Sequence, residues 1–421
     1  MKHLQNFVFN KKSGEYIINV LKWSILASLI GLISAFAGAL FHYAVDIGAH
    51  VRGVYPAIIF GLPLGGVIIV FLYHICKMDD DRGTNSILTS VRTAEKVPLV
   101  LAPLILVSTA ITHFFGGSAG REGAALQIGG SIGSCFARLL KLHTYSTSVL
   151  IMCGMSGLFS AVFGTPVTAA IFALEVSSVG VMHYGAFFPS LLSAIVAQSV
   201  AHLLRVEKTA FALAFVPAFE VFTILKVVLL ALLAAVLSIL FITAMHEASA
   251  VMSKLIKNKY LRVVSGAVIV IALTVIYGSM RYNGAGMDVI ASAVEQGRAL
   301  PWDFALKIIF TAITLGAGFK GGEIVPTFFI GSTFGVLVAP LLGLNASFGA
   351  AVALIALFCG VVNCPVASVF LSIELFGAEG LIYFAVASAV SYLFSGNFSL
   401  YSSQKMVFSK LRAVEYEDIK N

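Results

Sequence analysis

Residues 116–130 read GGSAGREGAALQIGG, and this glycine-rich stretch decides how the chain folds. The apolar run Val97–Phe115 leads into it, and an apolar helical pattern follows it. Because its glycines cluster ahead of the helical pattern, we expect a turn that opens directly into a helix. Such a turn directs free backbone N–H groups and the positive end of the helix dipole at one point, which favours an anion there.

Two charged residues, Arg121 and Glu122, lie inside this turn. An unpaired charge at membrane depth is costly, so each needs a reason to be there. One interpretation is an Arg–Glu ion pair that holds two helices together. The other is that Glu122 is a protonatable gate, which competes with an anion for the N–H groups of the turn. These residues by themselves leave both interpretations open.

The composition indicates a membrane protein with several spans. The 421 residues are 59% hydrophobic and 11% charged, and their mean hydropathy is +0.97. These values exclude an ordinary soluble domain. The net charge of +7 is spread over termini and short loops without a basic patch, so we expect no nucleic-acid partner. Basic residues at both ends, such as Lys11 and Lys410, predict cytoplasmic termini.

The apolar segments differ widely in length, and glycine or proline interrupts many of them. They run through Ile17–Val45, Val54–Ile75, Val97–Phe115, Val149–Leu174, Tyr184–Leu204, Val221–Ala244, Val263–Tyr277, Phe304–Leu315, Thr327–Leu342, Phe348–Phe376 and Leu381–Phe394. Several are longer or shorter than the ~20 residues that cross a bilayer upright. We therefore predict an all-α polytopic protein with tilted helices, some of which stop at mid-membrane.

An internal repeat relates the two halves of the chain. Residues 164–175 read GTPVTAAIFALE, and residues 363–374 read NCPVASVFLSIE. In both segments a glutamate follows the proline by nine residues, so each proline is expected to begin a helix and each glutamate to lie near its end. A charged glycine-rich turn lies upstream of each segment, at 117–123 and at 316–326. This order, occurring twice, predicts two repeats of inverted topology with a site where they meet.

The repeat predicts four parts of the chain. Residues 1–16 form a cytoplasmic N-terminal segment, 17–205 the first membrane repeat and 206–401 the second. Residues 402–421 form a cytoplasmic tail without a soluble regulatory domain.

Three further features carry weaker signals. The acidic run in Lys77–Arg82 fits a solvated loop better than a divalent-cation site, because basic residues flank it and no ligand spacing follows. Residues 83–86 read GTNS and begin another helix, with exposed N–H groups and hydroxyls. Tyr401 follows the last apolar run, where interfacial tyrosines are common. No cofactor and no metal are expected.

Together these residues resemble the CLC family of chloride channels and proton-coupled anion exchangers, from about residue 20 to about residue 405. GSAGREGAALQIGG is similar to the GREGP stretch of the family, with Ala124 in place of proline. Residues 83–87 lie where the family has GSGIP, and residues 322–326 where it has GxFxP. Tyr401 matches the tyrosine that covers the inner side of the anion site.

The resemblance implies a homodimer with one transport path in each subunit. It implies that the stretches 83–87, 120–124 and 322–327 converge on the anion, with Glu122 as outer gate and proton acceptor. Glu323 is implied as a second acid, on the proton path or in contact with fluoride. The implied anion-binding residues are Gly83, Thr84, Asn85, Gly120, Arg121, Gly123, Ile324, Val325 and Tyr401.

Departures from the family pattern point to one branch of it. Val176 stands where the chloride/proton exchangers have a second, inward-facing glutamate, so the usual inner proton relay is missing. Glu323 instead places an acid within the anion-binding stretch, and Thr84 replaces the serine that favours chloride. This pattern resembles the fluoride/proton antiporters. Those relatives usually have methionine or asparagine at the position of Thr84 and threonine at that of Val325, so two of their marks are absent.

We therefore expect an anion transporter of the cell membrane, most simply a proton-coupled fluoride exporter. The alternative is a chloride/proton exchanger or chloride channel of the same fold, which is favoured if Glu323 pairs with Lys320. A third reading is an intramembrane serine protease, with Ser156 in a GxSG motif and His183 or His202 as its base. We do not expect an enzyme, because a protease accounts for neither the repeat nor the two charged turns.

Overall fold

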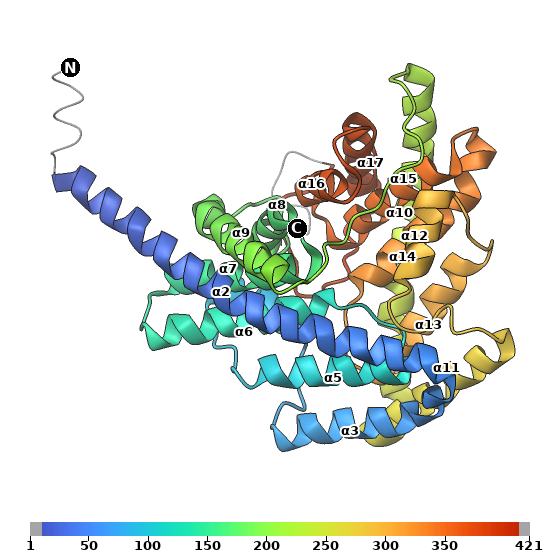
Figure 1. Ribbon diagram of the computed structural model, residues 1–421, viewed down its shortest axis with the longest axis horizontal. Helices are drawn as coiled ribbons and strands as arrows, with labels where there is room; N and C mark the ends of the chain where they lie inside the picture. Colours follow the sequence, from blue (N-terminus) through green and yellow to red (C-terminus); the bar gives the residue numbers. More distant parts are fainter. Residues whose placement is uncertain (1–10, 412–421) are drawn as a thin grey trace, which may run out of the picture.

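The computed structural model describes residues 11–411, and these form helices almost throughout (Figure 1). The first half of the chain forms α2 (Lys11–Val54), η1 (Pro56–Gly61), α3 (Leu62–Ile75), α4 (Thr84–Thr93), α5 (Leu101–Phe115), α6 (Glu122–Leu139), α7 (Thr144–Phe163), α8 (Pro166–Glu175), η2 (Tyr184–Ala186) and α9 (Phe187–Leu203). The second half forms α10 (Val221–Leu255), α11 (Lys259–Tyr277), α12 (Met287–Gln296), α13 (Asp303–Ala317), α14 (Ile324–Val338), η3 (Ala339–Leu342), α15 (Ala346–Val362), α16 (Pro365–Phe376) and α17 (Leu381–Phe394). Of the two expected terminal segments, residues 1–10 and 412–421 lie outside the described part.

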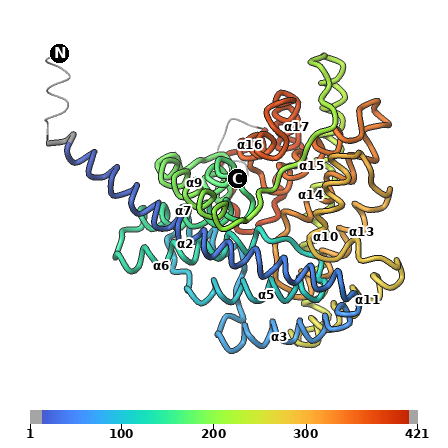
Figure 2. Tube along the Cα trace, viewed as in Figure 1, coloured from blue at the N-terminus to red at the C-terminus, as the bar shows by residue number. Residues whose placement is uncertain are grey.

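Seven helices of the described part are long and apolar enough to cross a bilayer, so the chain is a multi-pass membrane protein. The helices α2, with 44 residues, and α10, with 35, far exceed the ~20 residues of an upright span. They must therefore run obliquely or project beyond the hydrocarbon. Figures 1 and 2 show α2 crossing beside α5, α7 and α9, which it contacts along its length.

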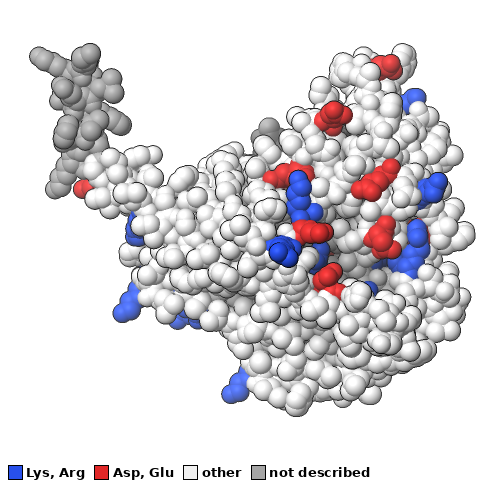
Figure 3. All heavy atoms as spheres, in the orientation of Figure 1, with Lys and Arg blue, Asp and Glu red and all other residues white. Residues whose placement is uncertain are grey.

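The surface fits this environment. Large apolar side chains are exposed along α2, α9 and α10, where they face outward from the protein core; examples are Phe36, Phe188 and Phe222. In the view of Figure 3, most charged side chains gather near the centre and right of the molecule, and broad uncharged areas surround them. Uncharged, apolar outer faces of this kind are those that lipid contacts.

The inverted repeat is visible in the helix pairs. In the first half α6 packs along α7, and in the second half α14 packs along α15. Both pairs depend on glycine, because the helix backbones touch. A Cβ added to Gly129 would lie 2.1 Å from the carbonyl oxygen of Gly154, and one added to Gly335 would lie 2.3 Å from that of Gly349. Small residues at a membrane-helix interface permit this close approach.

Two long apolar runs are each divided into two helices, and the second helix of each begins at the matched proline, as predicted. The expected run Val149–Leu174 divides into α7 and α8, and Phe348–Phe376 divides into α15 and α16. The break comes at a left-handed residue, Gly164 (φ 72°) or Asn363 (φ 56°), followed closely by proline. A left-handed residue ends the first helix, and proline lacks the N–H that a continuous helix would need.

The two matched glutamates bind across the repeat boundary. Glu175, at the end of α8, accepts hydrogen bonds from the backbone N–H groups of Val366 (3.2 Å) and Ala367 (2.9 Å) at the start of α16. Glu374, at the end of α16, accepts them from Val167 and Thr168 at the start of α8, both at 2.9 Å. Each proline-led helix therefore has its free N–H groups covered by a carboxylate from the other repeat.

A short parallel pairing returns the C-terminal segment to the core. β1 (Ser178–Val179) pairs with β2 (Lys405–Met406). The backbone N–H of Leu400 also donates to the carbonyl of Val361 at 2.9 Å. These contacts bring Tyr401 back from the end of α17 into the interior.

The reciprocal caps predict a specific loss of stability. Glu374→Ala leaves two helix N–H groups without their charged acceptor, so we expect the free energy of unfolding to fall by about 3 kcal/mol. The matched control is Glu379→Ala, since Glu379 is exposed in the loop after α16. Denaturant unfolding of the detergent-solubilised protein measures both variants. Equal stability of the two would show that the caps contribute nothing.

Candidate functional site

The site is built where two glycine-rich turns meet, one from each repeat. These paired turns, residues 116–121 and 318–323, connect α5 to α6 and α13 to α14. Gly120 donates its N–H to the carbonyl of Gly322 at 2.7 Å, and Gly322 donates to the carbonyl of Gly120 at 2.8 Å. This isolated antiparallel bridge places the N-termini of α6 and α14 side by side.

Glu122 is the first residue of α6, and its side chain is fully buried. Its Oε2 accepts a hydrogen bond from the backbone N–H of Val325, on α14, at 3.1 Å. Its Oε1 has no hydrogen-bond partner among the described residues. The Glu122 carboxyl group of the first repeat therefore accepts a hydrogen bond from the start of α14, the corresponding helix of the second repeat.

Glu323 immediately precedes α14 and is half-buried, and its Oε2, which is inaccessible to solvent, has no hydrogen-bond partner among the described residues. The alternative pairing with Lys320 is not formed. Lys320 instead lies 3.9 Å from the carboxylate of Asp81 and 4.2 Å from the centre of the Tyr73 ring. Glu323 is thus an acid without a basic partner in the described part of the chain.

A third helix start reaches the paired turns through Gly123. A Cβ added to Gly123 would lie 3.2 Å from Thr84 Oγ1 and 3.4 Å from Glu323 Oε2. Thr84 is the first residue of α4, and it follows Gly83, whose φ of 62° turns the chain into the helix. The structure therefore brings three helix N-termini, those of α4, α6 and α14, to one place.

The C-terminal segment closes another side of this region. Tyr401 is buried, and its hydroxyl has no hydrogen-bond partner in the described structure. It lies within electrostatic range of both Glu122 and Glu323. The amide oxygen of Asn85 accepts the N–H of Ser403 at 2.9 Å, so this predicted anion ligand holds the segment in place.

Arg121 turns away from Glu122. Its Nη1 donates to Nδ1 of His42 at 3.0 Å, and its guanidinium lies 5.9 Å from the centre of the Phe163 ring. No ion pair joins Arg121 to Glu122 in the described structure. Arg121 lines a cavity of about 580 Å³, which we call the arginine-lined cavity because Arg52 and Arg281 line it as well.

The other predicted site residues contribute backbone. Ile324 and Val325 are the first two residues of α14, and both are buried. The backbone N–H of Val325 donates to the carboxylate of Glu122. Gly120 supplies the bridge between the turns, and a side chain there would displace the Glu122 carboxylate. A Cβ added to it would lie 2.2 Å from Oε2 of Glu122.

The acidic loop and the GxSG motif have structural partners. Asp79 and Asp80 lie near Lys259, at 3.7 and 3.9 Å, and no group of three possible metal ligands occurs in residues 11–411. Ser156 donates to the carbonyls of Cys153 (3.1 Å) and Ser190 (2.9 Å) and forms no hydrogen bond with a described histidine.

Sequence reasoning missed Gln127 and His113. The amide nitrogen of Gln127 lies 3.4 Å from Thr84 Oγ1, and its amide oxygen has no partner among the described residues. The sequence signal for Gln127 was a polar residue inside an apolar helix, five residues after Glu122. His113, at the end of α5, donates from Nε2 to the carbonyl of Gly120 at 3.2 Å. Nothing in the sequence distinguished His113 from an ordinary core histidine.

Comparison with known proteins identifies the family of the chain. A family model described as "Voltage gated chloride channel" matches residues 64–396. The chain belongs to the CLC family. This CLC chain is 35% identical over 398 residues to a chloride/fluoride channel protein of Pseudomonas syringae pv. tomato, covering 93% of this chain and 88% of that one. It is 21% identical to an H(+)/Cl(-) exchange transporter, ClcA, of Vibrio campbellii, covering 83% and 81%.

A solved structure shares the fold closely. The crystal structure of a CLC-type fluoride/proton antiporter superposes with a TM-score of 0.89 at 30% identity, covering 92% of this chain and 99% of that one. The predicted all-α architecture with inverted repeats and discontinuous helices is confirmed, and the two-residue strands are a minor addition to it.

The close contact between the turns predicts that glycine is required at 322. A Cβ added to Gly322 would lie 2.6 Å from the backbone nitrogen of Gly123, so Gly322→Ala must push the turns apart. Misplacing reacting groups by about 1 Å can cost about a hundredfold in rate, and we expect anion flux to fall by that order. Gly53→Ala is the control, because no atom lies within 4 Å of its added Cβ. Anion efflux from proteoliposomes measures both, and normal flux in Gly322→Ala would contradict the prediction.

Proposed function

We propose that this CLC chain exports fluoride in exchange for protons. The observation that carries the proposal is the hydrogen bond of Glu122 to the N–H of Val325, because it joins a protonatable group to an anion-attracting helix start. The similarity to a chloride/fluoride channel protein and to a fluoride/proton antiporter supports fluoride as the anion.

The proposed mechanism is competition between a carboxylate and an anion. When Glu122 is ionised, its carboxylate accepts a hydrogen bond from the N–H of Val325 and so occupies the outer anion-binding position. Protonated, it loses its charge, its bond to that N–H weakens, and the anion can take its place. Because the site accepts either the carboxylate or the anion, proton entry is coupled to anion exit.

Fluoride requires strong hydrogen-bond donors, since removing its water is costly. The groups near the paired turns that can donate are Thr84, Gln127 and Tyr401, together with helix N–H groups. A protonated Glu323 would add another donor, and its lack of a basic partner favours that role. Val325 offers no hydroxyl, so we expect weaker discrimination than in relatives with threonine there.

Exchange with protons would supply the driving force. If one fluoride leaves for each proton that enters, two charges move in the favoured direction. At 100 mV this amounts to about 4.6 kcal/mol. That free energy supports a fluoride gradient of about three decades.

The second candidate is chloride/proton exchange on the same fold, which the similarity to the Vibrio exchanger supports. Val176 disfavours chloride/proton exchange, because it directly follows Glu175 where the exchangers have a second, inward-facing glutamate. Fluoride and chloride efflux from the same proteoliposomes, with proton flux recorded in parallel, distinguishes the two.

We also propose a homodimer in the cell membrane with both termini in the cytoplasm. Apolar side chains exposed on α9 and α17, such as Ile195 and Ile382, offer a face for a second copy. Light scattering of the detergent-solubilised protein tests the dimer, and a monomeric mass would exclude it. Labelling of cysteines added near each terminus, in sealed vesicles, tests the orientation.

Glu122→Gln is expected to abolish proton coupling, because glutamine keeps the shape of the side chain but carries no exchangeable charge. Fluoride should then move down its own gradient without proton movement. The measurement is proton flux in proteoliposomes under a fluoride gradient. Proton-driven fluoride movement that persists in this variant rules out Glu122 as the gate.

Glu323→Gln and Glu323→Ala are expected to reduce fluoride transport, or its proton coupling, by at least the order of tenfold, the effect of losing one strong hydrogen bond. The control is Glu295→Gln, because Glu295 is exposed on α12. Intact coupled fluoride transport in both Glu323 variants would favour the chloride alternative, as would a wild-type protein that carries chloride as readily as fluoride.

A further inference from the structure

A buried lysine near the site has no acidic partner. Lys307, on α13, is fully buried, and no carboxylate of the described residues lies within ion-pair distance of it. Its Nζ donates to the carbonyls of Gly284 (2.7 Å) and Tyr282 (3.1 Å) and lies 5.0 Å from the centre of the Phe329 ring. Burying a charge without a counter-ion is costly, so these contacts must compensate for it.

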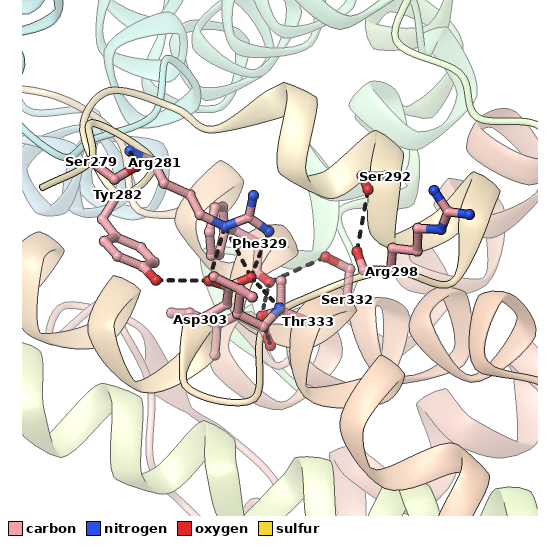
Figure 4. A network of polar contacts seen from close by, with 11 residues as sticks. Ser279, Arg281, Tyr282, Ser292, Arg298, Asp303, Phe329, Ser332 and Thr333 are labelled. Carbon is pink, nitrogen blue, oxygen red and sulfur yellow. Dashed lines mark hydrogen bonds and ion pairs between the residues drawn. The ribbon is translucent and has the colours of Figure 1, made fainter. Parts of the chain in front are cut away.

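Lys307 is one of two side chains of α13 that fix the middle of a loop. The loop, residues 278–286, connects α11 to α12. Figure 4 shows the second anchor, in which Asp303 accepts hydrogen bonds from Arg281 (2.7 Å to Nη2) and from the Tyr282 hydroxyl (2.8 Å). Asp303 and Lys307 lie one turn apart on α13, so a single helix fixes the loop.

The loop in turn holds the glycine-rich turn of the first repeat. The amide nitrogen of Asn283 donates to the carbonyl of Gly116 at 2.8 Å, and the N–H of Gly284 donates to the carbonyl of Gly117 at 3.0 Å. Gly284 therefore binds Lys307 through its carbonyl and the turn through its N–H. A continuous chain of hydrogen bonds runs from the buried ammonium to the turn that carries Glu122.

The same turn has two further supports. Ser118 binds α13 directly, through its N–H to Thr314 Oγ1 at 3.1 Å and its hydroxyl to Thr311 Oγ1 at 3.0 Å. His113 donates to the carbonyl of Gly120. All these contacts act on the backbone between α5 and α6, whose position decides whether Glu122 reaches the N–H of Val325.

We propose that Lys307 is a positioning residue for the gate, acting through the 278–286 loop to fix the turn that carries Glu122. The inference rests on the proposed function, because it assigns a purpose to Lys307 only if Glu122 couples protons to anions. Lys307 does not touch Glu122, so its loss should loosen the gate without removing the group that carries the proton. A loosened gate leaves the N–H of Val325 open to the anion for part of the time while Glu122 is still ionised.

The test compares Lys307→Met and Asn283→Ala with wild type in proteoliposomes. Lys307→Met keeps an unbranched side chain, one atom shorter, but removes the charge and the donors, and Asn283→Ala breaks a later link without disturbing the buried charge. We expect both to raise fluoride flux that is not accompanied by protons on the order of tenfold, the effect of one lost hydrogen bond. Lys226→Met is the control, because Lys226 also donates to a carbonyl, that of Gly343 at 3.1 Å, but lies in an exposed contact on α10.

The outcomes separate a positioning role from a merely structural one. A structural role would lower the yield or thermal stability of both variants while each folded molecule kept the wild-type ratio of protons to fluoride. That result would overturn the inference. If Lys307→Met does not fold, Asn283→Ala alone decides, and a wild-type ratio in it overturns the inference as well.

Glu122→Gln, measured in the same experiment, distinguishes this failure from failure of the proposed function. Loss of coupling in Glu122→Gln together with wild-type coupling in Asn283→Ala and Lys307→Met removes only the positioning role. Retained coupling in Glu122→Gln removes the proposed gate and the positioning role together.

Discussion

The rest of the site depends on the backbone bridge between Gly120 and Gly322. Two hydrogen bonds join the turns of opposite repeats, and they bring the N-termini of α6 and α14 together without any side chain between them. Glycine at 322 permits this approach, because a Cβ there would overlap the backbone nitrogen of Gly123, and a Cβ at 120 would displace the carboxylate of Glu122. The inverted repeat therefore creates the site directly: each half supplies a turn, a helix start and an acid, and neither half has a complete set.

The same contact occurs three times between the repeats. A carboxylate from one repeat accepts N–H groups at a helix start of the other: Glu122 at α14, Glu175 at α16 and Glu374 at α8. Helix N-termini inside a membrane have no water to satisfy their N–H groups, so an anionic group from elsewhere is the natural partner. The start of α8 meets the end of α16 and the start of α16 meets the end of α8, whereas α6 and α14 meet start to start. This chain places an acid at each of these meetings.

Much of this could be predicted from the sequence, because the signals are local. The glycines ahead of α6 and the matched proline and glutamate residues indicated the turns, the helix starts and the repeat before any partner was known. The partners were harder to predict, because they depend on how distant helices pack. Arg121 binds His42 on α2 and not the adjacent Glu122, and Lys320 lies by Asp81 and not by Glu323. Charge and spacing in the sequence offered the near partner as one interpretation in both cases, whereas the fold provides the distant one. Gln127 and Lys307 were missed for the same reason, because the role of each depends on contacts with residues of other segments.

The difference between a permanent cap and a gate then lies in how completely the carboxylate is satisfied. In Glu175 and Glu374 both oxygens accept a backbone N–H, so releasing either group would sacrifice two charge-assisted bonds, about 1.5–3 kcal/mol each. In Glu122 only Oε2 accepts such a bond, and Oε1 has no partner in the described structure. A group held by one bond is released at about half that cost, which protonation or an arriving anion can offset. A carboxylate that accepts backbone N–H groups thus caps two helix starts permanently and, by our proposal, caps the third reversibly. The geometry that separates them is the number of backbone N–H groups that donate a hydrogen bond to each carboxylate, two at Glu175 and at Glu374 and one at Glu122. At Glu122 the bond depends on the position of its turn.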